Sequence, residues 1–542
     1  MTRLCLLLAA SAAAQNVQHL TITEPGGMPG TPVMMGVSPA TNGVKVSWFG
    51  PSGYYQLWQK YSLTGAAWLA WGGATNAACM AAVPASGGKA FFRVSGPGPD
   101  YAGDRDCGEC HGAIRNSVLG TAHSRALAAL QQISQDANPN CLACHTVGYG
   151  LPTGYQNEST TPLLENVQCE NCHGPAGSHL ANPNNLGVVP RVELAAQVCG
   201  GCHNGAEHPT FDEWNGSPHG QVVPEVAGIM ASSSADISDC GRCHSGSARV
   251  KLLDGGDPTT TLTGDYDVPI TCAVCHDPHA QYVHTNTLNG VVADYFSGLL
   301  FTNNQLGAVY TNQIRNPYAS LITCSVSPSD SFSNVYDPGV NVCAQCHNER
   351  GAAWTDTSRS PHHSPQYNIL IGSADTNLPI AQFGAHALLE RQCVSCHMQS
   401  SPYVSESQPA VTGHSFEMNS YAICANCHGN VAGRVQFTTN SIATTIRQTV
   451  SYLDLWATNA APAQLRTNYN ILAWEYTTPG DLSAGGPGPS ASDQALIPDD
   501  IKKARFDLYL VFYDGSFGVH NPQYVSELLS NAETLVEGQL YQ

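Results

Sequence analysis

The sequence predicts a mainly α-helical fold of short helices and long loops, with a small β-sandwich before it and a helical segment after it. Three observations support this prediction. A five-residue motif with two cysteines and a histidine recurs between residues 107 and 428, β-rich segments precede it, and helical periodicity follows it. The 542-residue chain also contains 52 Gly and 34 Pro residues, which favour turns over long regular elements.

The N-terminal stretch MTRLCLLLAASAAAQ combines one arginine, an apolar run and a small-residue A-x-A site. This pattern predicts a secretory signal peptide over residues 1–14. The run is shorter than the roughly 20 residues that a membrane helix needs, and no later run qualifies. We therefore expect an exported protein, periplasmic or extracellular, with no membrane span.

Residues 15–98 contain no copy of the motif and are expected to form a β-sandwich module. The segments 44–50, 54–61 and 89–95 are rich in aromatic and β-branched residues, and Gly, Pro and Ser separate them. Such a module is usually a spacer or a docking unit, and we assign it no chemistry.

Eighteen of the 21 cysteines belong to nine copies of the pattern C-x-x-C-H. The cysteine pairs are Cys107 and Cys110, Cys141 and Cys144, Cys169 and Cys172, Cys199 and Cys202, Cys240 and Cys243, Cys272 and Cys275, Cys343 and Cys346, Cys393 and Cys396, and Cys424 and Cys427. The histidines that follow them are His111, His145, His173, His203, His244, His276, His347, His397 and His428.

C-x-x-C-H is the attachment signature of c-type haem. The two thiols, on one helical turn, each form a thioether to the haem, and the histidine that follows binds the iron. Zinc ribbons also use C-x-x-C pairs but need no histidine after each pair, and redox dithiols occur singly in βαβ patterns. Nine copies therefore predict nine haem c groups. Of the three other cysteines, Cys5 lies in the expected signal peptide, and Cys79 and Cys324 either form a disulfide or stay free thiols.

An electron-transfer haem needs a second axial ligand, usually His or Met. Twelve histidines lie outside the motifs, and nearly all of them are close to one in sequence. A nearby histidine usually cannot reach the opposite face of its own haem, so we expect it to bind the iron of a neighbouring haem. The expected distal ligands are His123, His179, His208, His219, His279, His362, His386, His414 and His520. His363 could replace His362, and His284 could replace His279. His19 is either an unligated terminal residue, which is favoured, or a ligand for a haem of a neighbouring subunit.

The motif region, residues 99–435, is expected to be a nine-haem cytochrome domain. It is too short to enclose each haem in its own apolar core, so the haems should stack and form the core themselves. Residues 436–542 are expected to form a helical region that packs on this domain, because apolar residues recur there with helical spacing, namely Ile442, Ile446, Val450, Leu453 and Ala457. Helices are also expected to begin near Pro498 and at Asn521-Pro522, which places His520 in the turn between them.

These motifs resemble those of the multihaem c-type cytochromes related to the nitrifiers' tetrahaem electron carrier. The group includes pentahaem nitrite reductase and hydroxylamine oxidoreductase. The matching stretches include NPNCLACHTVGYG (138–150), NVQCENCHGPAGSH (166–179), ITCAVCHDPHA (270–280) and, at the C-terminus, DGSFGVHNPQY (514–524). The resemblance implies electron transfer outside the cytoplasm, stacked haem pairs and bis-histidine ligation at most irons. The chain lacks the Cys-x-x-Cys-Lys haem of most nitrite reductases, so that catalytic assignment does not carry over.

Two functions are compatible with this pattern. The first is an electron conduit whose irons are all closed by two histidines, in one variant a polymerised filament. The second is a reductase or oxidoreductase of a small nitrogen or sulfur compound, such as nitrite or hydroxylamine, at one iron with an open position. The first is favoured because the histidines suffice to close nine irons. With a net charge of −19, we expect redox partner proteins with basic patches or extracellular acceptors, and no nucleic acid.

Overall fold

The computed structural model describes seven strands within residues 1–100 and most of residues 101–541. Within the latter range it leaves out residues 151–152, 182, 185–188, 191–193, 261–267, 280–285, 289–290, 294–312, 316–341, 373, 375–383, 389–392 and 484. His19, His284, Cys79 and Cys324 lie outside the described residues, so the expectations about them stay predictions. The chain divides into two compact units. Unit 1 comprises Met1–Cys202, Asp277–Gln281 and Thr311–Gln313, and unit 2 comprises His203–His276, Tyr282–Tyr310 and Ile314–Gln542.

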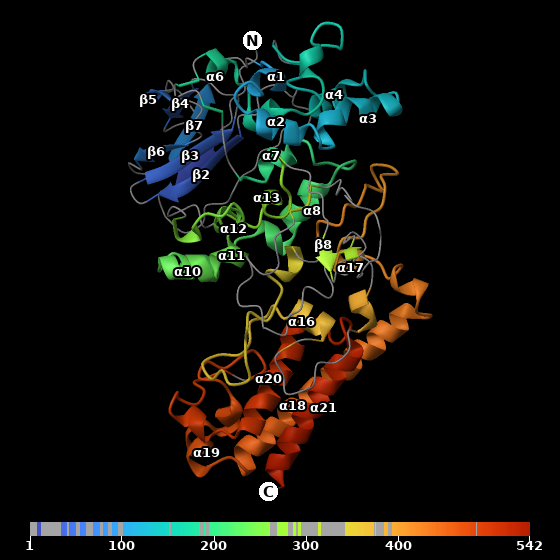
Figure 1. Ribbon diagram of the computed structural model, residues 1–542. Coiled ribbons are helices and arrows are strands. Elements are labelled where there is room, and N and C mark those ends of the chain that lie inside the picture. The colour runs from blue at the N-terminus through green and yellow to red at the C-terminus, as the bar shows by residue number, and fades with distance from the viewer. Residues whose placement is uncertain are drawn as a thin grey trace. The chain divides into compact units, whose positions relative to one another are not determined.

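Unit 1 begins with two antiparallel sheets (Figure 1), of strand order β1-β7-β4-β5 and β2-β3-β6. Three of the strands lie where the β-rich segments predicted them. That the two sheets pack face to face as a sandwich stays a prediction, and so does the signal peptide, part of which is β1. The strands are β1 (Leu8–Ser11), β2 (Met34–Ala40), β3 (Gly43–Phe49), β4 (Tyr55–Lys60), β5 (Leu69–Thr75), β6 (Met80–Pro84) and β7 (Lys89–Ser95).

The remainder of unit 1 consists of short helices joined by loops, as the Gly and Pro content predicted. Helix α4 shows how such a helix begins: the Asn138 side chain accepts a hydrogen bond from the Asn140 amide at 3.1 Å, and Pro139 occupies the first turn. The helices are α1 (Asp104–Cys107), α2 (Gly112–Val118), η1 (His123–Arg125), α3 (Ala126–Gln132), α4 (Pro139–His145), η2 (Pro162–Leu164), α5 (Cys169–His173), α6 (Gly177–Ala181) and α7 (Gln197–Gly200).

Unit 2 continues this pattern up to residue 428. Its short elements are α8 (Thr210–Gly216), η4 (Pro218–Gly220), α9 (Pro224–Met230), α10 (Ser234–Asp239), α11 (Gly241–His244), α12 (Gly246–Leu253), η5 (Pro258–Thr260), α13 (Cys272–Cys275), β8 (Asn286–Leu288), β9 (Val291–Ala293), α16 (Gln366–Ile371), η7 (Ala385–Leu388), α17 (Cys393–His397) and η8 (Cys424–Asn426). Among the described residues from 101 to 428, buried hydrophobic clusters are small, and the largest centred there holds six buried side chains.

Unit 2 ends in a helical bundle with a conventional apolar core, coloured red and orange in Figure 1. Its elements are α18 (Val431–Asn459), α19 (Ala463–Tyr469), η9 (Asn470–Trp474), η10 (Asp493–Leu496), α20 (Asp499–Asp514) and α21 (Pro522–Leu540). The predicted starts near Pro498 and at Asn521-Pro522 are confirmed. Asp499 and Asp500 lie in the first turn of α20, where carboxylates complement the helix dipole.

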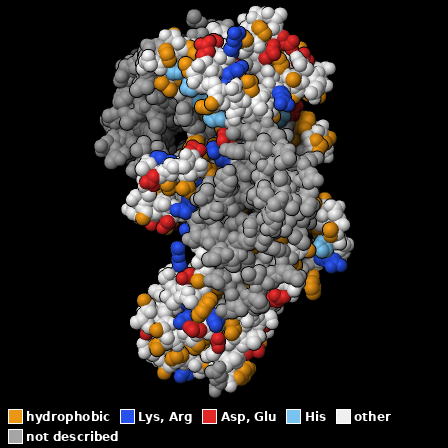
Figure 2. Space-filling model, in the orientation of Figure 1, with side chains coloured by type: hydrophobic (Ala, Val, Ile, Leu, Met, Phe, Trp, Pro, Cys, Tyr) orange, Lys and Arg blue, Asp and Glu red, His pale blue; other side chains and the backbone are white. Residues whose placement is uncertain are grey.

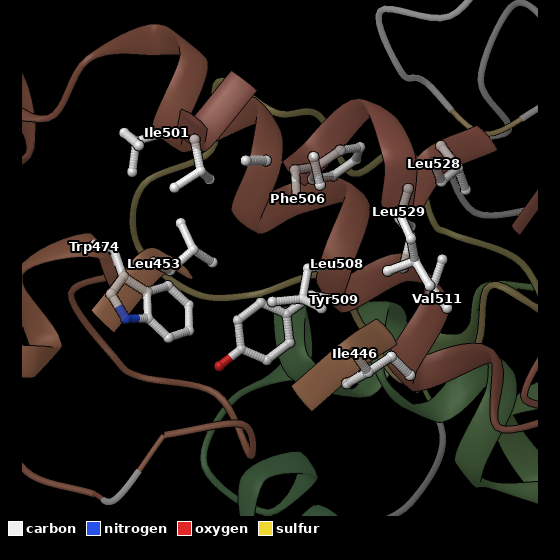
Figure 3. Packing of buried hydrophobic residues seen from close by; sticks show 14 of the residues in the cluster. Ile446, Leu453, Trp474, Ile501, Phe506, Leu508, Tyr509, Val511, Leu528 and Leu529 are labelled. Atoms are coloured by element: carbon white, nitrogen blue, oxygen red, sulfur yellow. The ribbon is translucent and has the colours of Figure 1, made fainter. Parts of the chain in front are cut away.

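The core cluster of this bundle contains 26 buried side chains, of which Ile369 and Ala374 come from the motif region. Ile442, Ile446, Leu453 and Ala457 of α18 are among them and Val450 is partly buried against them, so the periodicity correctly predicted the buried face. Figure 3 shows Leu453, Trp474 and Tyr509 converging from α18, η9 and α20. The contrast with the small clusters of the motif region fits the expectation that cofactors fill the space there. No helix in the described part of the chain is long and apolar enough to span a membrane.

Candidate haem-binding sites

The motif residues have the local geometry that haem attachment requires. In α5 and α17 the helix spans the whole motif, Cys169–His173 and Cys393–His397, so its cysteines, three positions apart, lie on one side of a turn. All 18 motif cysteines are described, and none of them forms a disulfide with another described cysteine. Each motif therefore places two sulfur atoms where a haem could be attached.

Six motif histidines each lie opposite a histidine from outside the motifs. The distances between ring centres are 5.9 to 6.2 Å. One pair, in unit 1, is His173 with His279. The five pairs in unit 2 are His347 with His219, His244 with His362, His276 with His414, His428 with His386, and His397 with His520.

This spacing matches a metal ion between two imidazoles. Since a metal–imidazole bond is about 2.0–2.1 Å long and the ring centre lies about 1.1 Å behind the bonded nitrogen, imidazoles on opposite sides of one iron should have centres about 6.3 Å apart. The six observed distances differ from this value by a few tenths of an ångström. The residues present therefore fit iron atoms held by two histidines.

The pKa shifts of several of these rings also suit iron binding, which requires a neutral imidazole, whereas Asp514 raises the pKa of His520. Burial, together with nearby positive groups, lowers the pKa of His219 to about 4 and that of His362 to about 3. Burial likewise lowers the pKa of His244, His347 and His414. The Nδ1 atom of His219 is buried and makes no hydrogen bond among the described residues.

The pairs join segments that are far apart in sequence. His279 comes three residues after His276, yet its ring lies opposite His173, with the two ring planes 7° from parallel. His276 lies instead opposite His414, at 6.2 Å. A histidine just after a motif is therefore placed beside the histidine of another motif, as the sequence predicted for this kind of residue.

Proline-containing turns place two of these distal histidines. His219 lies in η4, where Pro218 occupies the first position, and His362 directly follows Pro361. Between the two alternatives at 362 and 363, the structure places His362 opposite His244. His363 stacks on His362 with ring centres 4.4 Å apart.

The third motif is fixed to the segment before the first by Glu170, which lies between its two cysteines. The buried Glu170 carboxylate accepts hydrogen bonds from the amides of Ala102, Gly103 and Ala176 at 2.7 to 3.1 Å. The thiols of Cys107 and Cys169 lie close enough to each other to interact. The first and third motifs are therefore neighbours in unit 1.

Other motifs are also adjacent. The Cys243 thiol points to the Gln345 carbonyl at 3.9 Å and the Cys346 thiol to the Arg242 carbonyl at 4.0 Å, so the fifth and seventh motifs exchange equivalent contacts. The thiols of Cys144 and Cys202 also lie close enough to interact, so the second and fourth motifs are neighbours. Cofactors at such neighbouring motifs would be close to one another.

Glu213 holds the loop that carries His414. This α8 carboxylate accepts hydrogen bonds from the Thr412 amide at 2.9 Å, the Thr412 hydroxyl at 2.8 Å and the His414 amide at 2.7 Å. The loop also bonds to the segment before α8, from the Ala410 amide to the Ala206 carbonyl at 2.8 Å. Sequence reasoning missed Glu213, since a lone glutamate on a short helix carries no local signal.

A second set of contacts orients the rings through Nδ1. This atom of His397 is 3.0 Å from the Phe416 carbonyl oxygen, and that of His386 is 2.6 Å from the Val519 carbonyl oxygen. His520 differs, because its Nδ1 is 2.5 Å from a carboxylate oxygen of Asp514. Such partners fix the orientation of a ligating ring and raise its basicity.

The other three expected distal ligands are described with less detail. His123 begins η1, its carbonyl accepts a hydrogen bond from the Val167 amide at 3.1 Å, and burial lowers its pKa. His179 lies in α6 with a buried Nδ1 that makes no hydrogen bond among the described residues. His208 closes a turn through its amide, 3.1 Å from the Gly205 carbonyl. Their roles as ligands stay predictions.

Comparison with known proteins supports this interpretation. Three family models match: cytochrome c554 and c-prime over residues 106–174, cytochrome c7 and related cytochrome c over 153–245, and outer membrane cytochrome MtrC/MtrF-like, domains II/IV, over 319–459. Cytochrome c-554 of Nitrosomonas europaea is 28% identical over 159 residues, and the multiheme cytochrome MtrA of Shewanella baltica is 24% identical over 166 residues.

These alignments are partial. They cover 23% and 26% of this chain, and 66% and 46% of cytochrome c-554 and MtrA respectively. Among solved structures, the outer cell wall cytochrome OcwA is similar over 80% of this chain and 99% of its own, with a TM-score of 0.50 and 15% identity, which concerns the fold alone. The repeated motifs, the paired histidines and these similarities agree: the chain is a multihaem c-type cytochrome, related to the cytochrome c-554 of a nitrifier, and it binds haem c covalently.

Proposed function

We propose that this protein transfers electrons along a series of nine covalently bound c-type haems, most or all of them ligated by two histidines. The single observation that carries the proposal is the set of six motif histidines with a second imidazole opposite. Each bound haem would supply one Fe(III)/Fe(II) couple. An iron that two imidazoles close can exchange electrons but has no free position for a substrate.

The six pairs support the assignment of their twelve histidines as the iron ligands of the third and the fifth to ninth motifs. For the other motif histidines, His111, His145 and His203, we propose that the distal ligands come from His123, His179 and His208. These are the members of the expected set that the six pairs leave over, so the numbers match. The proximity of the first to the third motif and of the second to the fourth favours transfer between the corresponding sites.

The protein's charge suggests its partners. The chain has a net charge of −19, and haem propionates would make it more acidic. Figure 2 shows acidic, basic and hydrophobic side chains interspersed over the visible part of the C-terminal bundle, where no single kind dominates. Because the protein is acidic, we expect redox partners with basic patches, whose binding weakens as salt rises. We also propose that the protein is exported to the periplasm or cell exterior. Self-association into a filament is a variant that electron microscopy of native material would detect.

Electron paramagnetic resonance of the fully oxidised protein tests the proposal. Nine closed bis-histidine irons give only low-spin ferric signals, and iron analysis should give nine irons per chain. A substantial high-spin signal that nitrite or hydroxylamine perturbs would overturn the proposal and support a reductase. Fewer than nine irons per chain would contradict the count.

A further inference from the structure

The turn between α20 and α21 contacts two candidate haem sites at consecutive residues. His520 lies opposite His397 of the eighth motif, with ring centres 6.2 Å apart. The carbonyl of Val519 contacts Nδ1 of His386, which lies opposite His428 of the ninth motif. One short segment therefore supports the distal ligands of two motifs, but through different chemical groups.

The group behind His520 is a buried carboxylate. Asp514, the last residue of α20, has a fully buried side chain, whereas the His520 side chain is 22% exposed. One Asp514 oxygen is 2.5 Å from His520 Nδ1. The other accepts hydrogen bonds from the hydroxyl and the amide of Ser516. The Ser516 hydroxyl oxygen in turn accepts a hydrogen bond from the His520 amide at 3.1 Å, so the turn holds the carboxylate and the ring in one arrangement.

No lysine or arginine forms an ion pair with Asp514 within the described part of the chain. The Asp514 carboxylate is hydrogen-bonded to Ser516 and His520, and the imidazole is the titratable group that its negative charge affects most directly. The corresponding partner of His386 is a neutral backbone carbonyl, and so is that of His397.

We propose that Asp514 is a positioning residue that lowers the reduction potential of the eighth-motif haem below that of the ninth-motif haem. This inference rests on the proposed electron-transfer function. A carboxylate that accepts the Nδ1 proton makes the imidazole a stronger electron donor through Nε2. A stronger donor, with a negative charge nearby, stabilises Fe(III) more than Fe(II) and so disfavours uptake of the electron. The proton remains between Nδ1 and the carboxylate throughout.

The test compares reduction potentials of the holoprotein and of Asp514→Asn, measured by spectroelectrochemical titration with dithionite as the reductant. Asparagine keeps the size and an oxygen acceptor but removes the charge. We expect one of the reduction steps to become at least about tenfold more favourable, an upward shift of about 59 mV for one electron. The step is assigned to the eighth motif if His520→Met raises the same one, since methionine ligation raises the potential.

Two further variants separate tuning from structural effects. Asp514→Glu keeps the charge and should restore a potential near that of the wild type. Asp499→Asn removes a charge from an exposed side chain at the start of α20 and should leave every step unchanged. Unchanged potentials in low-spin Asp514→Asn would overturn the inference. A new high-spin signal in that variant would overturn it as well, since Asp514 would then hold the ring without tuning the iron. Failure of the proposed function would appear instead in the wild-type protein, as a substrate-sensitive high-spin iron.

Discussion

The contact between Glu213 and the His414 loop predicts a measurable change at a single haem site. Glu213→Ala removes the acceptor of three hydrogen bonds, from the Thr412 amide, the Thr412 hydroxyl and the His414 amide. A hydrogen bond to a charged group contributes about 1.5–3 kcal/mol, and three that share one carboxylate are not additive. We take about 3 kcal/mol as the loss, which raises the population of the open loop roughly 150-fold because each 1.4 kcal/mol is a factor of ten.

Hydrogen exchange measures this directly, because two of the donors are backbone amides. The Thr412 and His414 amides should exchange about 100-fold faster in Glu213→Ala, and a fraction of one low-spin iron should become high-spin as His414 leaves it. Asp212→Asn is the matched control. Asp212 is adjacent on α8, and its carboxylate accepts a hydrogen bond from the Gly205 amide at 2.7 Å rather than from Thr412 or His414. Unchanged exchange at Thr412 and His414 in Glu213→Ala would refute the reasoning.

Three other predictions concern separate parts of the molecule. Glu170→Ala leaves three amides without their acceptor, so we expect a local loss of about 3 kcal/mol and faster proteolysis near residues 101–104, whereas exposed Glu109→Gln should have no effect. Burial raises the pKa of Asp507 to about 7. The stability that this group contributes is therefore fully present below about pH 4 and is lost as pH rises through 7. The free energy of unfolding falls by up to about 4 kcal/mol over this range. Amides of α20 should then be less protected at pH 8 than at pH 5, and Asp507→Asn should abolish the difference. Finally, the His219–His347 and His386–His428 ring planes are 89° apart. Perpendicular planes leave two iron d orbitals nearly equal in energy, so these irons should give strongly anisotropic low-spin signals, distinct from a rhombic signal of the nearly parallel His173–His279 pair. Uniform signals would contradict the described ring angles.

The elements best predicted from the sequence are those that local rules determine. The strands near residues 44–50, 54–61 and 89–95 follow from β-propensity, and α21 begins at Asn521-Pro522 because asparagine caps a helix and proline fits its first turn. In the motif region the helices last only one or two turns. Their exact number and limits depend on tertiary contacts such as those of Glu170, which no periodic pattern reveals.

The sequence predicted the residue types of the candidate site, but only partly which histidines lie opposite each other. Because nearly all the histidines lie near motifs, their involvement could be inferred from counting. The pairing could not, since His279 belongs opposite His173 and His276 opposite His414 only in the folded chain. The groups that orient the rings were missed for the same reason. Asp514 reads in sequence as the end of a helix, and its carboxylate is near His520 only because Gly515, in the left-handed conformation at φ 72°, turns the chain back.

This pairing also explains why the motif region folds without a large apolar core. Each histidine pair joins two segments distant in sequence, such as His244 with His362, and an iron between the rings would connect them through two bonds to protein. Two thioethers per motif add covalent attachment on one side. A cofactor fixed in this way acts as a cross-link, and it also fills the volume that leucine and valine fill in the C-terminal bundle. Attachment of haem should therefore be part of folding for residues 101–428. The bundle, which contributes all but two of the 26 buried side chains of its core cluster, supplies a rigid support for His520 and for the carbonyl that orients His386.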